Sequence, residues 1–382
     1  MKGEQRIMLL TPPKECEIEF NDLRLVRLKC DPKYENIFIE NTTISIKDTY
    51  DEITKDFARN LVKIDRLGYD PVGYFTIGKE VWLAFTKSGS DFVGFEVVTR
   101  KRGGCIKIGP TYIEPNMRGR GYAEQMINAL CRSYRAVGAR KMYVTAPLNN
   151  APTAVLDFQK LHLKMEALLS RHYHTKSSER VCGKFLEASR DVEGSTPLRL
   201  ELSLANNESA NTSIEINNLQ TELPFSLLSN FIRTNMSHYY DDIDDNFVKA
   251  LVHGTEESLE VYEKKAKILL TIIHDTTKLA GVAALTPKRG GSLKISPLII
   301  DHKVVCKKVL GDLLDMIMLQ ARKMSRRKIT IILPVSYIAV IDAILAHGYV
   351  SEGILREPYK RSVDMVVLSR FLQKDIGALD QV

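Results

Sequence analysis

The sequence lacks the long apolar runs that mark proteins inserted in membranes. In 382 residues there is no stretch of about 18 consecutive apolar side chains, the minimum for a membrane-spanning helix. Near the start, only four apolar residues follow one another, Ile7 to Leu10, and a signal peptide needs a longer apolar core. We therefore expect a cytoplasmic protein without a membrane partner.

Paired cysteines are also lacking. The six cysteines are widely scattered, and none forms a Cys-x-x-Cys pair or lies near two histidines at metal-ligand spacing. This pattern supports neither a metal site nor a disulfide framework, so we expect reduced thiols at Cys16, Cys30, Cys105, Cys131, Cys182 and Cys306.

A strong excess of one charge is missing as well. The net charge is +7, with 26% charged and 44% hydrophobic residues, a composition typical of soluble globular proteins. Such a mild basic excess does not indicate nucleic-acid binding by itself. It fits a protein that binds an anionic cofactor or an acidic partner.

An internal repeat is the main organising feature that is present. Gly94–Thr99 is followed by Arg-Gly-Gly, Lys-Ile and Pro, and Gly281–Thr286 is followed by the same residues, each matched pair being 187 positions apart. Pro147 and Pro334 match at the same spacing. A match over strand, turn and strand predicts that the chain is a duplication.

The pattern of each copy predicts a helix, several strands, a second helix and a further strand, in that order. In the first copy, apolar positions recur at three- and four-residue steps from Ala123 to Val137, which predicts a helix. The Arg102-Gly103-Gly104 junction predicts a hairpin turn. The fold class expected from this order is mixed α/β. The other expected elements are a helical region at Ile46–Ile64, strands at Asp22–Lys29, Val81–Phe85, Phe92–Arg100, Cys105–Ile113 and Lys141–Thr145, and a helix at Pro224–Ser237.

The segment RGRGYA, Arg118 to Ala123, joins the end of a predicted strand to the start of the predicted helix. Helix starts carry unpaired backbone N–H groups and the positive end of the helix dipole. Glycines let the backbone approach an anion closely, and arginines add charge. The segment therefore predicts a site for a pyrophosphate.

With this context RGRGYA resembles the Arg/Gln-x-x-Gly-x-Gly/Ala motif of GNAT acetyltransferases. Asn150, Ala154, Phe158 and Lys160-Leu161-His162-Leu163 resemble a later stretch of that family. The resemblance covers about residues 45–187 and implies two tandem GNAT-like domains. They would be an acetyltransferase domain at 1–187 (core 45–187), a linker at 188–212 and a degenerate copy at 213–382.

The resemblance also implies that acetyl-CoA is the acyl donor. Backbone groups of Thr111, Tyr112 and Ile113 would pair with its pantetheine arm, and the helix start would hold its pyrophosphate. The cofactor-binding residues implied at the helix start and beyond it are Arg118, Gly119, Arg120, Gly121, Tyr122, Ala123 and Asn150. Surrounding basic residues would be mostly solvated, with one of them reaching the remaining phosphate: Arg100, Lys101, Arg135, Arg140 and Lys141.

The catalytic residues of the family are replaced in this sequence. Lys107 stands where many members carry a glutamate base, and Phe158 stands where many carry a tyrosine acid. Substitute bases are Glu96, Glu114, His172 and His174, and substitute acids are Tyr173 and Tyr122. The predicted catalytic set is Glu96, Glu114 and Tyr173.

The second copy lacks the glycine-rich helix start, because Val305–Leu310 occupies the matched positions and contains no glycine. We expect Lys307 and Lys308 to be solvated, and we expect this copy to act as a scaffold, a substrate wall or a dimer surface.

Three functions remain open at this point. The first is an N-acetyltransferase that acts on a primary amine of a small molecule, a protein or an aminoacyl group. The second is a non-catalytic acyl-CoA sensor, favoured by Lys107 and Phe158. The third, a nucleic-acid or ribosome-associated factor, has only the basic charge in its favour.

Overall fold

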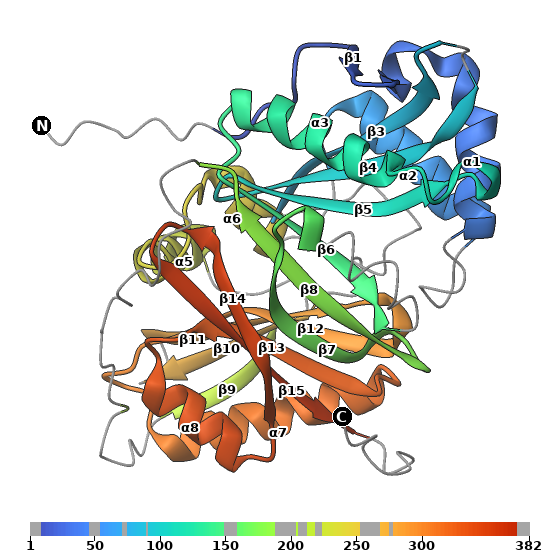
Figure 1. The fold of residues 1–382 in the computed structure, drawn as a ribbon. Coiled ribbons are helices and arrows are strands. Elements are labelled where there is room, and N and C mark those ends of the chain that lie inside the picture. Colours follow the sequence, from blue (N-terminus) through green and yellow to red (C-terminus); the bar gives the residue numbers. More distant parts are fainter. Residues whose placement is uncertain are drawn as a thin grey trace, which may run out of the picture.

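The two halves of the chain build one continuous mixed sheet, with helices on both of its faces (Figure 1). The computed structural model describes residues 9–45, 54–70, 75–88, 91–148, 159–187, 204, 212–217, 224–252, 268–274 and 278–372.

In its described residues, the N-terminal half contributes eight strands and three α-helices. The strands are β1 (Glu17–Phe20), β2 (Leu23–Arg27), β3 (Thr76–Thr86), β4 (Phe92–Lys101), β5 (Cys105–Ile113), β6 (Lys141–Pro147), β7 (Lys164–His174) and β8 (Ser177–Phe185). The helices are α1 (Glu35–Ser45), α2 (Lys55–Leu67) and α3 (Tyr122–Ala136).

The C-terminal half contributes the remaining strands and helices. Its strands are β9 (Thr212–Asn217), β10 (Ile268–His274), β11 (Lys278–Pro287), β12 (Ser292–Ile300), β13 (Lys328–Pro334), β14 (Val350–Lys360) and β15 (Val363–Phe371). Its helices are α5 (Phe225–Met236), α6 (Asp245–Val252), α7 (Lys307–Lys323) and α8 (Ile338–Ala346).

The strand order runs β1-β2-β3-β4-β5-β6-β8-β7-β14-β15-β13-β12-β11-β10-β9. Read from the two ends toward the middle, β2-β3-β4-β5-β6-β8-β7 corresponds to β9-β10-β11-β12-β13-β15-β14, and β1 is an additional edge strand of the N-terminal half. Each half has one parallel pair, β5 with β6 and β12 with β13, and a helix connects the two strands of each pair, α3 in the first and α7 in the second.

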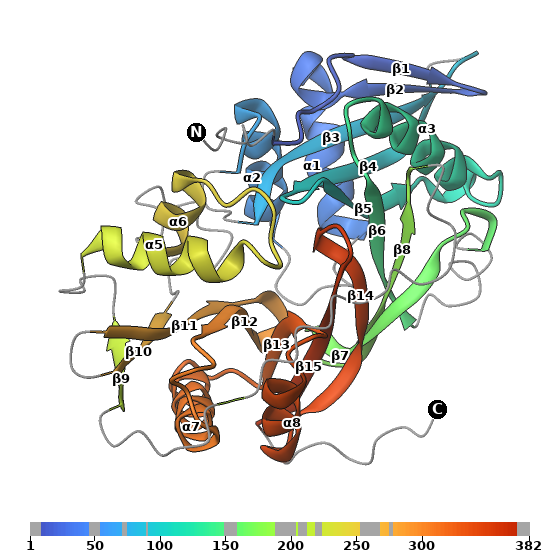
Figure 2. The ribbon, with the colours of Figure 1, turned by 90° about the vertical axis from the view of Figure 1, so that its left-hand side faces the viewer.

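Helices cover opposite faces of the sheet because each buries one apolar stripe. In the N-terminal half, α3 packs with Trp82 and Ile108 on one face, and α2 packs with Phe95 and Val97 on the other. In the C-terminal half, α5 and α6 lie on one side of the strands and α7 and α8 on the other (Figure 2).

The halves meet where β7 pairs with β14, with Gly353 opposite Ala167. Two buried ion pairs flank this junction. Lys141 contacts Glu166 at 2.7 Å, and Lys328 contacts Glu352 at 2.6 Å. Each lysine also donates to a backbone carbonyl of the other half, Lys141 to Arg356 O and Lys328 to Ser170 O.

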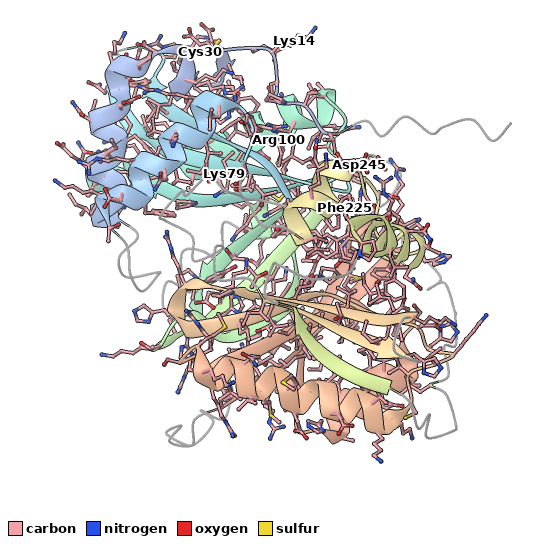
Figure 3. The ribbon with its side chains drawn as sticks, turned by 180° about the vertical axis from the view of Figure 1, so that it is seen from behind. Lys14, Cys30, Lys79, Arg100, Phe225 and Asp245 are labelled. Carbon is pink, nitrogen blue, oxygen red and sulfur yellow. A yellow bond between two sulfur atoms is a disulfide. The ribbon has the colours of Figure 1, made fainter. Side chains whose placement is uncertain are left out.

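Two expectations from the sequence are wrong. Cys16 and Cys30 form a disulfide, which the 14-residue spacing did not suggest, because the antiparallel β1–β2 pair brings the two cysteines together. Arg100, Arg140 and Lys141 are buried rather than solvated. Arg100, labelled in Figure 3, donates to Glu80 and to the carbonyls of Leu10 and Gly68.

Arg135, Lys307 and Lys308 are exposed, as expected. Among the described residues no helix is both long and apolar enough to cross a membrane.

Candidate functional site

The start of α3 is an exposed corner whose backbone donors lack helical partners. The first hydrogen bond of the helix runs from Gln125 N–H to Gly121 O at 3.1 Å. The N–H groups of Tyr122, Ala123 and Glu124 precede that bond and are the orphan donors of the helix start. The geometry suits an anion.

Two glycines give this corner its shape. Gly119 and Gly121 have φ angles of 77° and 76°, a region that L side chains rarely adopt. A Cβ atom added at either glycine would meet no atom within 4 Å. The space beside the backbone is therefore open, and the corner fits the coenzyme A diphosphate expected from the sequence.

Strand β5 leads into this corner with an open edge. It pairs with β6 only from Cys105 to Ile108, so beyond that point the two strands part. The expected pantetheine contacts, Thr111, Tyr112 and Ile113, follow the parting point. The carbonyl of Ile113 accepts a hydrogen bond from Arg118 Nε at 3.0 Å, which ties the strand end to the loop before α3.

The matched corner of the C-terminal half contains buried side chains and no glycine. Val305 and Cys306 precede α7 and are buried. Leu310 N–H bonds Cys306 O at 3.0 Å. Every position from Val305 to Leu310 therefore carries a Cβ beside the backbone.

A cavity of about 290 Å³ lies between the two halves of the protein. Directly opposite residues on neighbouring strands share one face of a sheet. Lys79, Thr99, Lys107 and Tyr143 are paired in this way across β3, β4, β5 and β6, and all four line the cavity. From the other half, Lys294 on β12 and its partner Thr330 on β13 line it as well.

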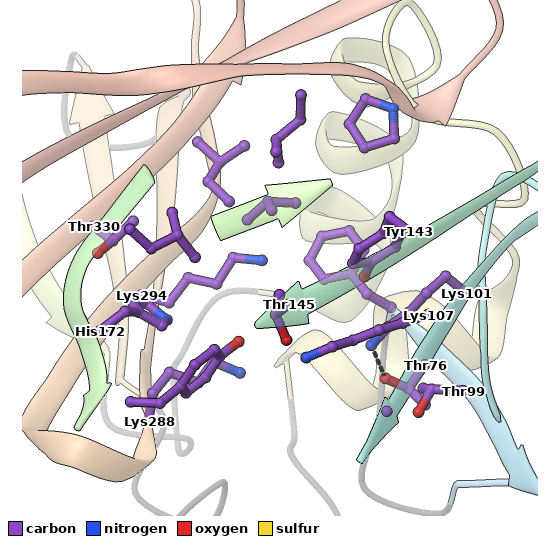
Figure 4. Close-up of a pocket in the computed structure, with 18 of the residues that line it drawn as sticks. Thr76, Thr99, Lys101, Lys107, Tyr143, Thr145, His172, Lys288, Lys294 and Thr330 are labelled. Carbon is purple, nitrogen blue, oxygen red and sulfur yellow. Dashed lines mark hydrogen bonds between the residues drawn. The ribbon is translucent and has the colours of Figure 1, made fainter. Parts of the chain in front are cut away.

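Lys107 and Lys294 reach into this cavity from opposite sides (Figure 4). Lys107 Nζ lies 5.2 Å from the ring centroid of Tyr173, and Lys294 Nζ lies 3.3 Å from the hydroxyl of Tyr359. Burial lowers the pKa of each lysine to about 8. Both are still mainly protonated at neutral pH.

His172 and Tyr173 form the floor next to Lys107. His172 is 5% exposed, and its Nδ1 has no hydrogen-bond partner among the described residues. Burial, reinforced by nearby lysines, lowers the pKa of His172 well below its usual value, so the ring is neutral. Glu179 accepts the backbone N–H groups of His172 and Tyr173, and burial raises its pKa to about 7.

The predicted catalytic residues do not come together. Glu96 pairs with Trp82 and therefore faces α3, on the sheet face away from the cavity. It accepts a hydrogen bond from Thr111 at 2.6 Å, and burial raises its pKa well above the usual value. Glu114 lies at the loop before α3, and only Tyr173 lines the cavity.

Other predicted residues lie elsewhere. His174 accepts a hydrogen bond from Lys176 N–H at 3.0 Å, and neither His174 nor Tyr122 is among the residues lining the cavity. Asn150, Ala154 and Phe158 lie outside the described residues. Sequence reasoning noticed Lys107 but missed the cavity, although the pairs Lys101/Lys288 and Lys107/Lys294 both recur 187 positions apart.

Comparison with known families gives a match to the acetyltransferase (GNAT) family over residues 35–158. That match covers β3 to β6 and α3, and so includes the corner at the α3 start. A comparison with curated proteins finds no match.

Solved structures of GNAT acetyltransferases resemble less than half of the chain. An acetyltransferase from Bacillus anthracis is 17% identical and covers 44% of this chain and 98% of its own, with a TM-score of 0.36. Spermidine N-acetyltransferase from Vibrio cholerae, solved with CoA and spermine, is 14% identical and covers 43% and 96%, with a TM-score of 0.36.

Proposed function

Because residues 35–158 are a GNAT acetyltransferase domain, we propose that the protein transfers an acetyl group from acetyl-CoA to a primary amine. GNAT acetyltransferases use acetyl-CoA as the acyl donor. The amine acceptor of this chain is a separate question, addressed below.

One observation carries the proposal. Gly119 and Gly121 leave open space beside an unpaired helix start, directly after a strand with a free edge. A diphosphate at the start of α3 would place the pantetheine arm along β5, from Ile113 toward the point where β5 and β6 part. The thioester would then lie close to the cavity.

The reaction needs few groups from the protein. The neutral amine attacks the thioester carbonyl, a C–N bond forms and the C–S bond breaks. The proton that the nitrogen loses passes to the Tyr173 phenolate, which replaces the proton that Tyr173 gives to the departing thiolate. Backbone N–H groups of β5 stabilise the negative charge on the carbonyl oxygen. Tyr173, the predicted catalytic residue that lines the cavity, supplies a proton to the departing thiolate. Glu96 and Glu114 stay predictions as bases.

The duplication is part of the same proposal. Residues 1–187 would form the acetyltransferase domain, 188–212 the linker and 213–382 a degenerate copy that walls the cavity. The mirrored strand order and the paired Lys-Glu contacts at the junction support it. A cytoplasmic location and a homodimer stay predictions.

A turnover assay tests the proposal. Free thiol released from acetyl-CoA is followed with a panel of primary amines, and an acetylated product is identified by mass spectrometry. Amine-dependent thiol release is the expected result. Acetyl-CoA binding without turnover of any amine would instead support the acyl-CoA sensor.

A further inference from the structure

The cavity between the halves is lined by far more cations than anions. Among its described lining residues, the one carboxylate is Glu166, which is already bonded to Lys141 at 2.7 Å. The remaining cationic side chains come from both halves of the protein: Lys79, Lys101, Lys107, Lys288, Arg289 and Lys294.

Lys107 and Lys294 are the matched cations of this lining, one from each half. Within the described part of the chain, neither has a carboxylate within 4.0 Å. Their contacts are with the ring of Tyr173 and the hydroxyl of Tyr359. Enclosing two ammonium groups in one cavity is costly when Glu179, near Lys107, is the carboxylate that acts on the pair, and a bound anion lowers that cost.

Further groups can hold an oxyanion and its carrier. Hydroxyls of Thr99, Thr145 and Thr330 line the cavity, and Thr145 lies between the two lysines in Figure 4. The partnerless Nδ1 of His172 offers an additional hydrogen bond. A volume of about 290 Å³ suits a small molecule rather than a protein segment.

The position of the cavity connects it to acyl transfer. Gly109 and Pro110 line it, and they follow Ile108, the last residue of β5 paired with β6. On the basis of the proposed function, we propose that this cavity is the acceptor site and that it takes a small amine carrying phosphate or carboxylate groups. The C-terminal half supplies Lys294 and Lys288, so the site is built by both halves.

Anion binding is tested first, in a way that does not depend on acetyl transfer. Inorganic pyrophosphate and citrate are titrated into the Gly121→Glu variant, whose added carboxylate keeps anions away from the α3 corner. We expect saturable binding of at least one anion. Absence of binding by both would overturn the proposal, and the preferred anion distinguishes phosphate from carboxylate recognition.

Lysine variants in the same background locate the bound anion. Lys107→Met and Lys294→Met are each expected to weaken binding by about tenfold or more, whereas Lys307→Met, at an exposed site on α7, leaves it unchanged. The melting temperature of the two cavity variants without ligand should not fall, since an uncompensated charge is removed. Unchanged anion affinity in Lys294→Met would overturn the proposal.

An acetylation assay distinguishes the proposed acceptor class from the proposed acetyltransferase activity. Ethanolamine and phosphoethanolamine are compared as acceptors with wild-type protein and Lys294→Met. The phosphorylated amine should be preferred, and the preference should fall by about tenfold or more in the variant. Preference for ethanolamine would refute the acceptor class alone. Anion binding in the cavity without turnover of any amine would refute acetyl transfer.

Discussion

At the scale of single residues, Tyr173 is the side chain that joins the predicted chemistry to the observed cavity. It lies on β7, its ring contacts His172 and Lys107, and it stands on the lining of the cavity. We expect Tyr173→Phe to lower kcat about 10- to 100-fold, because the proton donor is lost. Steady-state kinetics checks this, with KM for acetyl-CoA unchanged. A kcat equal to the wild-type value would exclude Tyr173 as the acid.

The lowered pKa of Lys294 predicts that the free energy of unfolding depends on pH. Its folded pKa of about 8 lies below the value of about 10.4 in an unfolded chain. Below pH 8 the buried charge destabilises the folded state fully, and above about pH 10.4 both states are neutral. The charged or titratable groups that face it are Lys107, His172 and Tyr359.

Lys294→Met should therefore be more stable than wild type at pH 7, and this difference should shrink as the pH rises from 8 toward about 10.4. Urea unfolding at pH 7, 8, 9 and 10 measures it. A difference that is independent of pH would show that Lys294 keeps an ordinary pKa in the folded protein.

The role of a single residue was predictable from the sequence where its neighbours along the chain determine the local conformation. Gly119, Gly121 and Arg118 gave the helix start correctly, because backbone conformation there depends on neighbouring residues. The lowered pKa of Lys107 was not predictable, since burial and the nearby charges of Lys79 and Lys294 cause it. Likewise, nothing near Arg100 in the sequence shows that Glu80, Leu10 and Gly68 surround it.

At the scale of elements, most of the periodic segments were predicted within a few residues. Cys105–Ile113 is confirmed as β5, Ala123–Val137 as α3 and Pro224–Ser237 as α5, each with shifts of two residues or fewer at its ends. The hairpin turn at Gly103 and Gly104 is confirmed by φ angles of 76° and 72°. The expected helix at Ile46–Ile64 corresponds in its described part to α2, which begins at Lys55.

The β7–β14 junction was not predicted, because strand pairing between distant segments leaves no local pattern. The pairing of β7 with β14 requires a glycine at position 353. Its φ angle is 136°, and an added Cβ would lie 2.4 Å from Glu166 O.

Gly353→Ala is expected to destabilise the protein by about 3 kcal/mol, from backbone strain and a clash at the junction. Gly311→Ala, in the interior of α7 with no atom near the added Cβ, should instead stabilise it by about 0.5–1 kcal/mol. Denaturant unfolding of both variants measures these changes. Equal stability of Gly353→Ala and wild type would mean that the junction tolerates separation of β7 from β14.

At the scale of the whole molecule, the two copies of the repeat differ at their helix starts but line one cavity together. One half keeps a glycine-rich helix start at Gly119 and Gly121, and the other has the buried Val305 and Cys306 before its helix and no glycine. The cavity takes matched lysines, Lys107 and Lys294, from both halves. The sequence predicted the repeat, but it could not show that the halves face each other across these residues.

The central claim is that one helix start per chain binds coenzyme A, and a calorimetric titration of acetyl-CoA tests it most directly. The matched variants are Gly121→Glu and Lys308→Glu, which add a carboxylate at the same position of the two halves. We predict one acetyl-CoA per chain for wild type and Lys308→Glu, and a loss of affinity of about tenfold or more in Gly121→Glu. Equal affinity in Gly121→Glu and wild type would contradict the account.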